Sequence, residues 1–250
     1  MQLSISKIKM FKSCRRQYEL HYVEGLKPIT VSDALETGRR YHEIIASLYA
    51  GENIEDDFSK EAAMATAYQK YIMPHFKVKS TEAKLELDLG DGDTLIGYAD
   101  GIAEDGSIVE HKTISRDIDE GYEYDLMWDQ QILAYMYITG ARKVYYTVCK
   151  KPTIRQKQNE TEEEFFHRMV EWYDTDTDKK IRLLTLYRTD DEVRDFALEL
   201  DDMRYEMKRC NHFYRNQAFC NMWGRRCEYA SVCLHYDPEM EYAEFVKEEN

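Results

Sequence analysis

The sequence lacks any run of 18 apolar residues, the length that a helix needs to cross a bilayer. Its first seven residues do not contain the apolar stretch of a signal peptide, and no internal repeat or low-complexity segment is present. Cations are also scarce, since 34 Lys and Arg against 48 Asp and Glu give a formal charge of −14. We therefore expect a soluble, cytoplasmic protein without a membrane partner, and one that does not coat nucleic acid through overall positive charge.

The chain has only six cysteines, and disulfides are rare in the reducing compartment expected for it. Clustered cysteines are therefore interpreted as metal ligands or buried thiols. A length of 250 residues with 43% hydrophobic content is enough for one sizeable core. We expect a single domain over 1–250, with a helical part at 1–78, a central core at 79–150, and a helical, cysteine-rich part at 151–250.

Two short motifs stand ten residues apart in the centre of the chain: Gly97-Tyr98-Ala99-Asp100 and Glu110-His111-Lys112. The alternating residues between them are broken at Asp105-Gly106, which predicts two strands joined by a tight turn. A three-residue loop over 104–106 pairs Ala103 with Ser107 and places Asp100 opposite Glu110. A two-residue loop would instead set Asp100 against His111 and separate the carboxylates.

In the first register the hairpin has the residues of a metal site. Asp100 and Glu110 would lie about 5 Å apart at Cβ, close enough for both carboxylates to bind one divalent cation. Lys112 shares the face of Glu110, whereas His111 points away. Oxygen ligands select Mg²⁺ or Mn²⁺, and a lysine beside the ion suits a phosphodiester substrate. The alternative is a solvated hairpin whose polar face happens to carry these groups.

The remaining periodicities predict an α/β protein. One or two helices are expected over 4–23, and further helices over 32–49, 59–76, 120–139 and 190–209. Strands are expected over 84–89, 94–98, 144–150 and 182–187, with 144–150 central in the sheet. A meander, a helix and then a strand favour a mixed sheet flanked by helices.

Two helices carry candidate site residues. His42 follows Gly38 by four positions in the second helix, although a lone helical histidine is more often a packed or exposed residue than a ligand. Gln131 and Tyr135 are also four apart, so they share one helix face and both could reach the site. The alternative for this pair is a capping glutamine and an amphipathic core tyrosine.

The tail carries three cysteines, Cys220, Cys227 and Cys233. Three thiolates need a fourth ligand to close a tetrahedral or cubane site, and Cys14 is the natural donor. Cys210 is a possible substitute, whereas Cys149 lies in a predicted strand and is interpreted as a buried thiol. The alternative is three unrelated tail cysteines.

A local basic patch could still form a positive groove on this acidic chain. The candidates are Lys7, Lys9, Lys12, Arg15, Arg16, Arg39, Arg40, Lys150, Lys151, Arg155 and Lys157. For any single one of them, an ordinary surface charge is the simpler interpretation.

These motifs, in this order over residues 4–233, resemble the PD-(D/E)XK nuclease superfamily. The resemblance is to its RecB-like branch, which includes AddB-type and CRISPR-associated exonucleases and many phage nucleases. It implies a restriction-endonuclease-like core and a metal-dependent DNA nuclease, most simply an exonuclease acting on single strands or linear ends. Such enzymes serve recombination, repair or phage DNA processing, with a helicase or recombinase as a possible partner.

The resemblance also assigns roles to residues. His42, Asp100, Glu110 and the backbone carbonyl of His111 would hold Mg²⁺ or Mn²⁺, and Lys112 would stabilise the transition state. Gln131 and Tyr135 would help to hold the DNA backbone and the surroundings of the lysine. A [4Fe-4S] cluster would be bound by the four cysteines Cys14, Cys220, Cys227 and Cys233.

The match to the cysteine pattern is incomplete. The five-residue gap from Cys227 to Cys233 fits the iron–sulfur nucleases, whereas the six-residue gap after Cys220 departs from them. Zn²⁺ or a metal-free site is therefore an alternative. Two other functions also stay open: a DNA-binding or assembly subunit without catalysis, and a metal-dependent phosphodiesterase acting on RNA or nucleotides.

Overall fold

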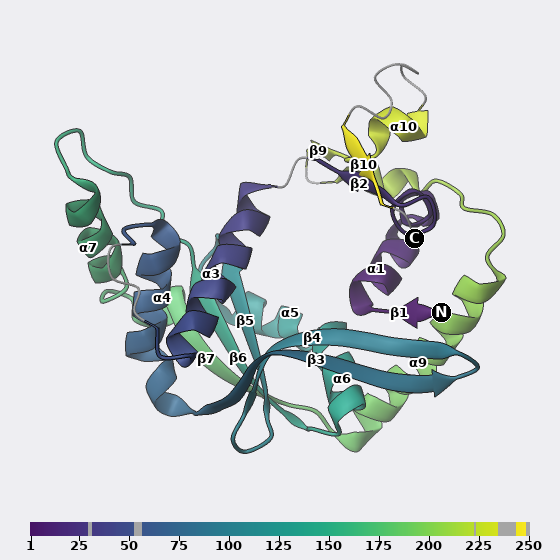
Figure 1. Cartoon of the computed structure of the whole chain (residues 1–250), viewed down its shortest axis with the longest axis horizontal. Helices are drawn as coiled ribbons and strands as arrows, with labels where there is room; N and C mark the ends of the chain where they lie inside the picture. The colour runs from purple at the N-terminus through teal and green to yellow at the C-terminus, as the bar shows by residue number, and fades with distance from the viewer. Residues whose placement is uncertain (30–31, 53–56, 223, 235–243, 249–250) are drawn as a thin grey trace. The chain divides into compact units, whose positions relative to one another are not determined.

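The computed structural model describes residues 1–29, 32–52, 57–222, 224–234 and 244–248 (Figure 1). Its contacts divide the chain into two compact units. Unit 1 comprises residues 1–32, 88–96 and 197–250, and unit 2 comprises residues 33–87 and 97–196. Within the described ranges, no helix combines the length and apolar character that a membrane crossing requires.

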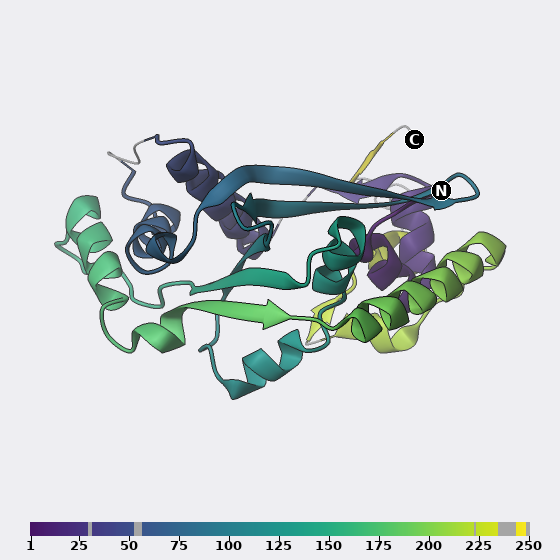
Figure 2. The same ribbon diagram turned by 90° about the horizontal axis from the view of Figure 1, so that it is seen from below.

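Unit 2 is built on a mixed sheet (Figure 2). Its strands follow the order β4 (Asp93–Ala103), β5 (Ile108–Ile114), β6 (Lys143–Lys150) and β7 (Ile181–Tyr187), and β3 (Val78–Gly90) also pairs with β4. The β5–β6 pair is parallel, whereas β4–β5 and β6–β7 are antiparallel. All four predicted strand regions are confirmed, and β6 is central as expected. The first two strands are longer than predicted.

Helices cover both faces of this sheet. Alternate residues of β6 enter different apolar clusters: Tyr145 and Cys149 pack with one, and Val144 and Val148 belong to the other. Successive side chains of a strand point to opposite faces, so the two clusters mark the two sides of the sheet. The predicted α/β class, with a mixed sheet flanked by helices, is confirmed.

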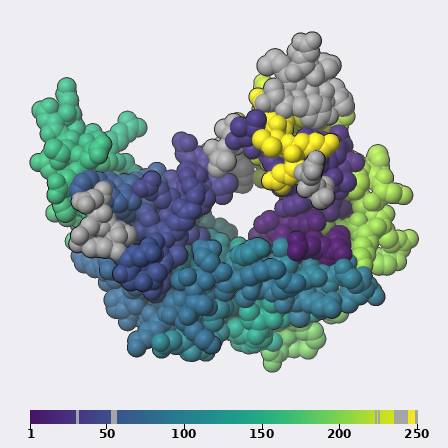
Figure 3. Space-filling model, in the orientation of Figure 1, coloured from purple at the N-terminus to yellow at the C-terminus, as the bar shows by residue number. Residues whose placement is uncertain are grey.

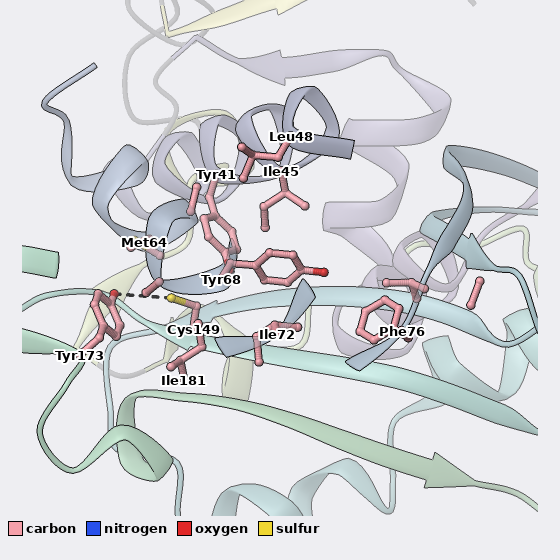
Figure 4. Close-up of a cluster of buried hydrophobic side chains, with 14 residues drawn as sticks. Tyr41, Ile45, Leu48, Met64, Tyr68, Ile72, Phe76, Cys149, Tyr173 and Ile181 are labelled. Carbon is pink, nitrogen blue, oxygen red and sulfur yellow. Dashed lines mark hydrogen bonds between the residues drawn. The ribbon is translucent and has the colours of Figure 1, made fainter. Parts of the chain in front are cut away.

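The first cluster is formed by α3 (Asp33–Tyr49), α4 (Lys60–Tyr71) and the sheet (Figure 4). Tyr41 and Ile45 lie one helical turn apart on α3 and are each 1% exposed, which gives this helix a buried stripe. The Cys149 thiol lies 3.5 Å from the Tyr173 hydroxyl. Cys149 is thus the buried thiol that was predicted. The short 3₁₀ turn Met73–His75 follows α4, and α7 (Glu162–Trp172) packs against α4 (Figure 3).

The other face carries α5 (Glu120–Leu126) and α6 (Gln130–Thr139). The prediction of one continuous helix over 120–139 is wrong, because the chain turns at 127–129. The Asp129 side chain accepts a hydrogen bond of 2.8 Å from the Gln131 N–H, so it caps a new helix. An aspartate that bonds the backbone in this way competes with helix continuation.

Unit 1 begins with β1 (Gln2–Leu3), which pairs in parallel with the start of β4. Three short helical segments follow, namely α1 (Ile5–Ser13), α2 (Arg15–Tyr18) and the π-helix Glu19–Val23. The predicted helical region 4–23 is therefore confirmed. The Ser4 side chain accepts from the Lys7 N–H at 3.2 Å and starts α1.

The later segments of unit 1 are mostly short. They are β2 (Leu26–Pro28), the turn Gln217–Phe219, β8 (Asn221–Met222), β9 (Arg225–Arg226), α10 (Ala230–Leu234) and β10 (Phe245–Lys247). The long helix α9 (Asp190–Arg209) has the predicted bounds and contributes its second half to this unit, while α8 (Thr177–Lys180) precedes β7 in unit 2. A small core around Leu20, Tyr229 and Val232 holds the β2–β10 pair in place.

Candidate active site

The register of the β4–β5 hairpin decides whether the two carboxylates meet. Gly101 pairs with Val109 and Ile102 with Ile108, and the Ala103 N–H donates to the Ser107 carbonyl at 2.8 Å. Residues 104–106 form the loop, with Gly106 in the left-handed region at φ 81°. Continuing this ladder places Asp100 opposite Glu110. The predicted register is confirmed, and the two-residue alternative is excluded.

Asp100 is held by His42, which α3 presents to the hairpin. His42 Nδ1 lies 2.9 Å from Asp100 Oδ1. Asp100 Oδ2 accepts from the backbone N–H of His111 at 2.6 Å. Burial is the largest single influence and disfavours both charged forms, but the hydrogen bond between them and the neighbouring charges together outweigh it: the pKa of His42 is raised, and that of Asp100 is lowered. The two side chains therefore favour an imidazolium–carboxylate pair.

Glu110 is the most buried acid of the site, with its side chain 4% exposed. Its Oε1 contacts the Lys112 ammonium, whereas its Oε2 is buried and has no hydrogen-bond partner among the residues that the structure describes. Burial raises the pKa of Glu110 to about 7, the Lys112 charge opposes this shift, and the Asp100 carboxylate adds to it. A buried carboxylate oxygen without a partner is costly, and a bound cation would satisfy it.

A chain of hydrogen bonds leads from Lys112 into α6. Lys112 Nζ donates to Gln131 Oε1 at 3.3 Å, and Gln131 Nε2 donates to the Tyr135 hydroxyl at 2.6 Å. The Tyr135 hydroxyl in turn donates to the Tyr98 carbonyl at 2.5 Å. Both α6 residues thus face the site, as their spacing suggested, and they fix the lysine from the side opposite Glu110.

Gly97 has a steric reason to be glycine. A Cβ built on it would lie 2.5 Å from the Tyr135 ring, closer than Cβ contacts come in real structures. The motif at 97–100 therefore has two functions: Gly97 leaves space for the Tyr135 ring, and Asp100 supplies a carboxylate to the site. Ring and strand are in direct contact.

His111 points away from the carboxylates, as the strand alternation predicted. Its ring is buried, with Nδ1 2.7 Å from the Thr147 hydroxyl oxygen. Burial lowers the pKa of His111 to about 4, so the ring is neutral near pH 7. Its N–H bonds to Asp100, and because the N–H and C=O of one strand residue face the same edge, its carbonyl also faces β4.

Thr147 was missed by the sequence reasoning. It is 2% exposed on β6, and its hydroxyl contacts both the His111 ring and the Glu110 carbonyl, the latter at 3.4 Å. Thr147 therefore fixes the part of β5 that lies between Glu110 and Lys112. The available signal was a single threonine, the one small polar side chain in the strand 144–149.

The predicted cysteine ligands all belong to unit 1. Cys14, Cys220, Cys227 and Cys233 line one cavity of about 680 Å³. Their thiols are free, and Cys14 and Cys220 are hydrogen-bonded to the backbone of Asn216. Burial raises the pKa of the Cys227 and Cys233 thiols, which favours the neutral form. Cys210 is 3.9 Å from an Arg15 nitrogen and lines a different cavity.

Across the described ranges, no group of three or more His, Cys, Asp or Glu side chains is arranged to hold a metal ion. For the cysteines, the prediction of an iron–sulfur cluster, or of Zn²⁺, therefore finds no support. Within the same ranges, His42, Asp100 and Glu110 do not form such a group either. Their carboxylate oxygens are nevertheless donors of the type that a hard divalent cation takes, and Glu110 Oε2 has no partner within these ranges. The other oxygens of the hairpin carboxylates are engaged with His42, Lys112 and the His111 N–H.

Comparison with known proteins gives a fold and a family match over part of the chain. A model of the PD-(D/E)XK nuclease superfamily matches residues 2–76, which include His42 but not Asp100 to Lys112. No curated protein matches the chain in sequence. A candidate exonuclease from Eubacterium rectale has a similar structure, with a TM-score of 0.54 at 13% identity, covering 100% of this chain and 90% of that one. This likeness shows a restriction-endonuclease-like fold.

Two further structures are more distant. An alkaline exonuclease from Laribacter hongkongensis has a TM-score of 0.41 at 11% identity, covering 83% of this chain and 88% of its own. A phage-related exonuclease from Haemophilus somnus has a TM-score of 0.36 at 17% identity, covering 76% and 94%.

Proposed function

We propose that this chain is a metal-dependent DNA nuclease that hydrolyses phosphodiester bonds, acting as an exonuclease on single strands or linear ends. The observation that supports it most is the convergence of His42, Asp100, Glu110 and Lys112, with one oxygen of Glu110 buried and unpartnered. A non-catalytic subunit would not need these groups together. Each of the other features, including the helix-flanked sheet, is compatible with both functions.

One group of residues would bind the metal ion, and Lys112 would contact the substrate. Asp100, Glu110, His42 and the His111 carbonyl would hold Mg²⁺ or Mn²⁺, the ions that oxygen-rich sites select. When bound, such an ion lowers the pKa of a water and neutralises charge on the phosphate. The burial of Glu110 and the neutral His111 ring behind it give the site a low dielectric, in which these charges act strongly.

Lys112 is the residue that we assign to the phosphate. Contact with Glu110 keeps it charged: burial lowers its pKa, the Glu110 carboxylate raises it, and the net pKa is raised. Its ammonium is positioned by Gln131, which Tyr135 holds in turn. A fixed cation of this kind stabilises charge that develops on the non-bridging oxygens in the transition state.

The test is degradation of end-labelled DNA by the whole chain with Mn²⁺ or Mg²⁺. Linear single-stranded, linear duplex and closed circular DNA are compared, because an exonuclease spares the circle. We expect metal-dependent loss of the labelled end, reduced at least about 100-fold by Lys112→Ala. Lys70→Ala serves as the matched control, since Lys70 is half-exposed on α4 and pairs with Asp174.

Three results would contradict the proposal. Equal rates of DNA degradation by Lys112→Ala and the parent would show that Lys112 takes no part in the reaction. If RNA oligonucleotides were cleaved in preference to DNA in a competition assay, the result would favour a phosphodiesterase that acts on RNA or nucleotides. Absence of cleavage with every metal, from a folded protein that still binds DNA, would favour the non-catalytic subunit.

A further inference from the structure

Positive charge on this acidic chain is concentrated in two segments of unit 1. Residues 4–18 contain five Lys or Arg and no acid, and residues 203–216 contain four Lys or Arg and one acid. The chain as a whole has a formal charge of −14. Nine of its cations therefore occupy 29 positions that almost lack acids, although Arg15, Arg16, Arg204 and Lys208 form ion pairs with nearby carboxylates. Segments this rich in cations are candidates for a polyanion-binding surface.

The two segments pack against each other although they are about 200 positions apart. The Arg16 N–H donates to the Tyr214 carbonyl at 3.2 Å, and the Asn216 side chain donates to the Ser13 carbonyl at 2.9 Å. The Tyr18 and Phe213 rings stack with centroids 6.1 Å apart. The two segments are thus neighbours in unit 1.

A cavity of about 440 Å³ opens on the surface, lined by residues of both segments, and cations and aromatic rings alternate along its lining. The Arg15 guanidinium lies 4.9 Å from the centroids of both the Phe11 and Tyr214 rings. The Arg209 guanidinium lies 5.0 Å from the Tyr205 ring and donates to its hydroxyl. Glu206 is the one acid in the lining, and it is paired with Arg15.

The rings and the second arginine remain accessible. Tyr205 is 62% exposed and Tyr214 is 49% exposed, so both rings can contact a ligand. Arg209 is exposed as well, and it forms no ion pair within the described ranges. Exposed rings beside the Arg209 guanidinium, which no described carboxylate neutralises, match a ligand that carries both flat apolar faces and negative charge.

We propose that this surface binds a nucleic-acid strand, with phosphates contacted by Arg209 and the neighbouring cations and bases stacked on Tyr205 and Tyr214. A flexible single strand fits best, because its unpaired bases are free to stack. An acidic peptide would match the charge but would leave the rings without a purpose. The choice of DNA as the ligand rests on the proposed nuclease function, whereas every residue of the candidate active site lies in unit 2.

The test measures binding apart from cleavage. Fluorescence anisotropy of a labelled single-stranded oligonucleotide is recorded with full-length Lys112→Ala protein and a chelator, at several salt concentrations. Tyr205→Ala should weaken binding roughly 5- to 150-fold, the effect of losing one stacked base. Arg209→Gln should lower the slope of log K against log salt by about 0.7. Both side chains are exposed on α9, so neither change removes core packing.

Matched controls come from unit 2. Tyr187→Ala removes a ring that is 65% exposed, and Arg194→Gln removes a guanidinium whose side chain is 66% exposed. Both controls should bind as the Lys112→Ala parent does. Thermal unfolding of each variant checks that the fold is retained.

The outcomes separate this proposal from the nuclease. If DNA is cut by the unmodified chain but Tyr205→Ala and Arg209→Gln bind like their controls, the surface is wrong and the nuclease stands. If both variants lose affinity but no DNA is ever cut, the surface stands and the nuclease fails. If polyglutamate displaces the oligonucleotide at equal charge concentration and Tyr205→Ala has no effect, the surface binds acidic peptides instead and the proposal is overturned.

Discussion

The β4–β5 hairpin and the cysteine-lined cavity were predicted by the same kind of reasoning, from short motifs in order, but they differ in what brings the residues together. In the hairpin, a sheet ladder and a three-residue loop determine the facing pair. Around the cavity, strand pairing aligns only part of the set: Cys220 and Cys227 flank the β8–β9 hairpin, and the Cys227 N–H donates to the Cys220 carbonyl at 2.9 Å. Cys14 lies at the start of α2 and Cys233 lies in α10, outside this pairing. A sheet ladder positions side chains without a ligand, whereas residues gathered from separate segments need a ligand to fix them.

The largest effect is expected at Glu110, and it tests whether the hairpin site is catalytic. Glu110→Gln keeps the volume but removes the charge of the most buried carboxylate. We expect nuclease activity to fall by about 10²- to 10³-fold while the fold is retained. End-labelled DNA assays measure the nuclease activity, and circular dichroism measures whether the fold is retained. Full activity in Glu110→Gln would mean that the hairpin is structural.

A second prediction tests how firmly the sheet positions the helix behind the site. Gly97→Ala places a methyl group against the Tyr135 ring, whose hydroxyl is fixed to β4, so we expect a loss of about 1–3 kcal/mol of unfolding free energy. Gly38→Ala is the control, because its added Cβ would meet only Thr113 Oγ1 at 3.6 Å, an ordinary contact. In a helix this control should gain about 0.5–1 kcal/mol.

Urea unfolding curves of Gly97→Ala, Gly38→Ala and the parent decide the second prediction. A Gly97→Ala protein as stable as the parent would show that the ring moves aside freely.

The third prediction concerns pH and uses the raised pKa of Glu110. The folded protein holds this proton up to about pH 7, whereas the unfolded chain releases it near the ordinary pKa of a glutamate, about 4.3. The folded state therefore binds more protons between these values, and this group's contribution to stability falls as pH rises through that window. The Glu110→Gln variant has no titrating group at this position and therefore lacks this pH-dependent contribution to stability.

Metal-free parent and Glu110→Gln should therefore be compared by urea unfolding between pH 4.5 and 8. The parent should lose stability relative to the variant as pH rises. His111, whose pKa is lowered to about 4, changes stability in the opposite direction, but it is common to both proteins and cancels in the difference. A constant difference across this range would contradict the prediction.

The smallest effect is expected at the cysteines. Cys220 is exposed, so Cys220→Ser should change the unfolding free energy by no more than about 0.5 kcal/mol. Iron, sulfide and zinc are measured in the anaerobically purified parent and variant. A loss of several kcal/mol together with the loss of bound metal would show that the cavity is a metal site after all.

The sequence predicts a structural feature well when the residues that determine it are close together in the chain. Asp105-Gly106 and the alternation around it are sufficient to place Asp100 opposite Glu110, because a glycine in the left-handed region closes the loop. The break before Asp129 was missed, because the periodicity continues through it and the new helix is marked only by the hydrogen bond with which Asp129 caps its start. Thr147 was missed because its partner, His111, is close to it only through the β5–β6 pairing.

The hairpin register also restricts how this chain can change in length. Surface loops usually tolerate insertions, and 104–106 is an exposed loop of that kind. Here, however, nine residues separate Asp100 from Glu110, and one added residue within either strand would turn one carboxylate to the opposite face. Related sequences that keep the site should therefore differ in this interval by balanced additions to both strands, or by loop changes that leave Ala103 paired with Ser107.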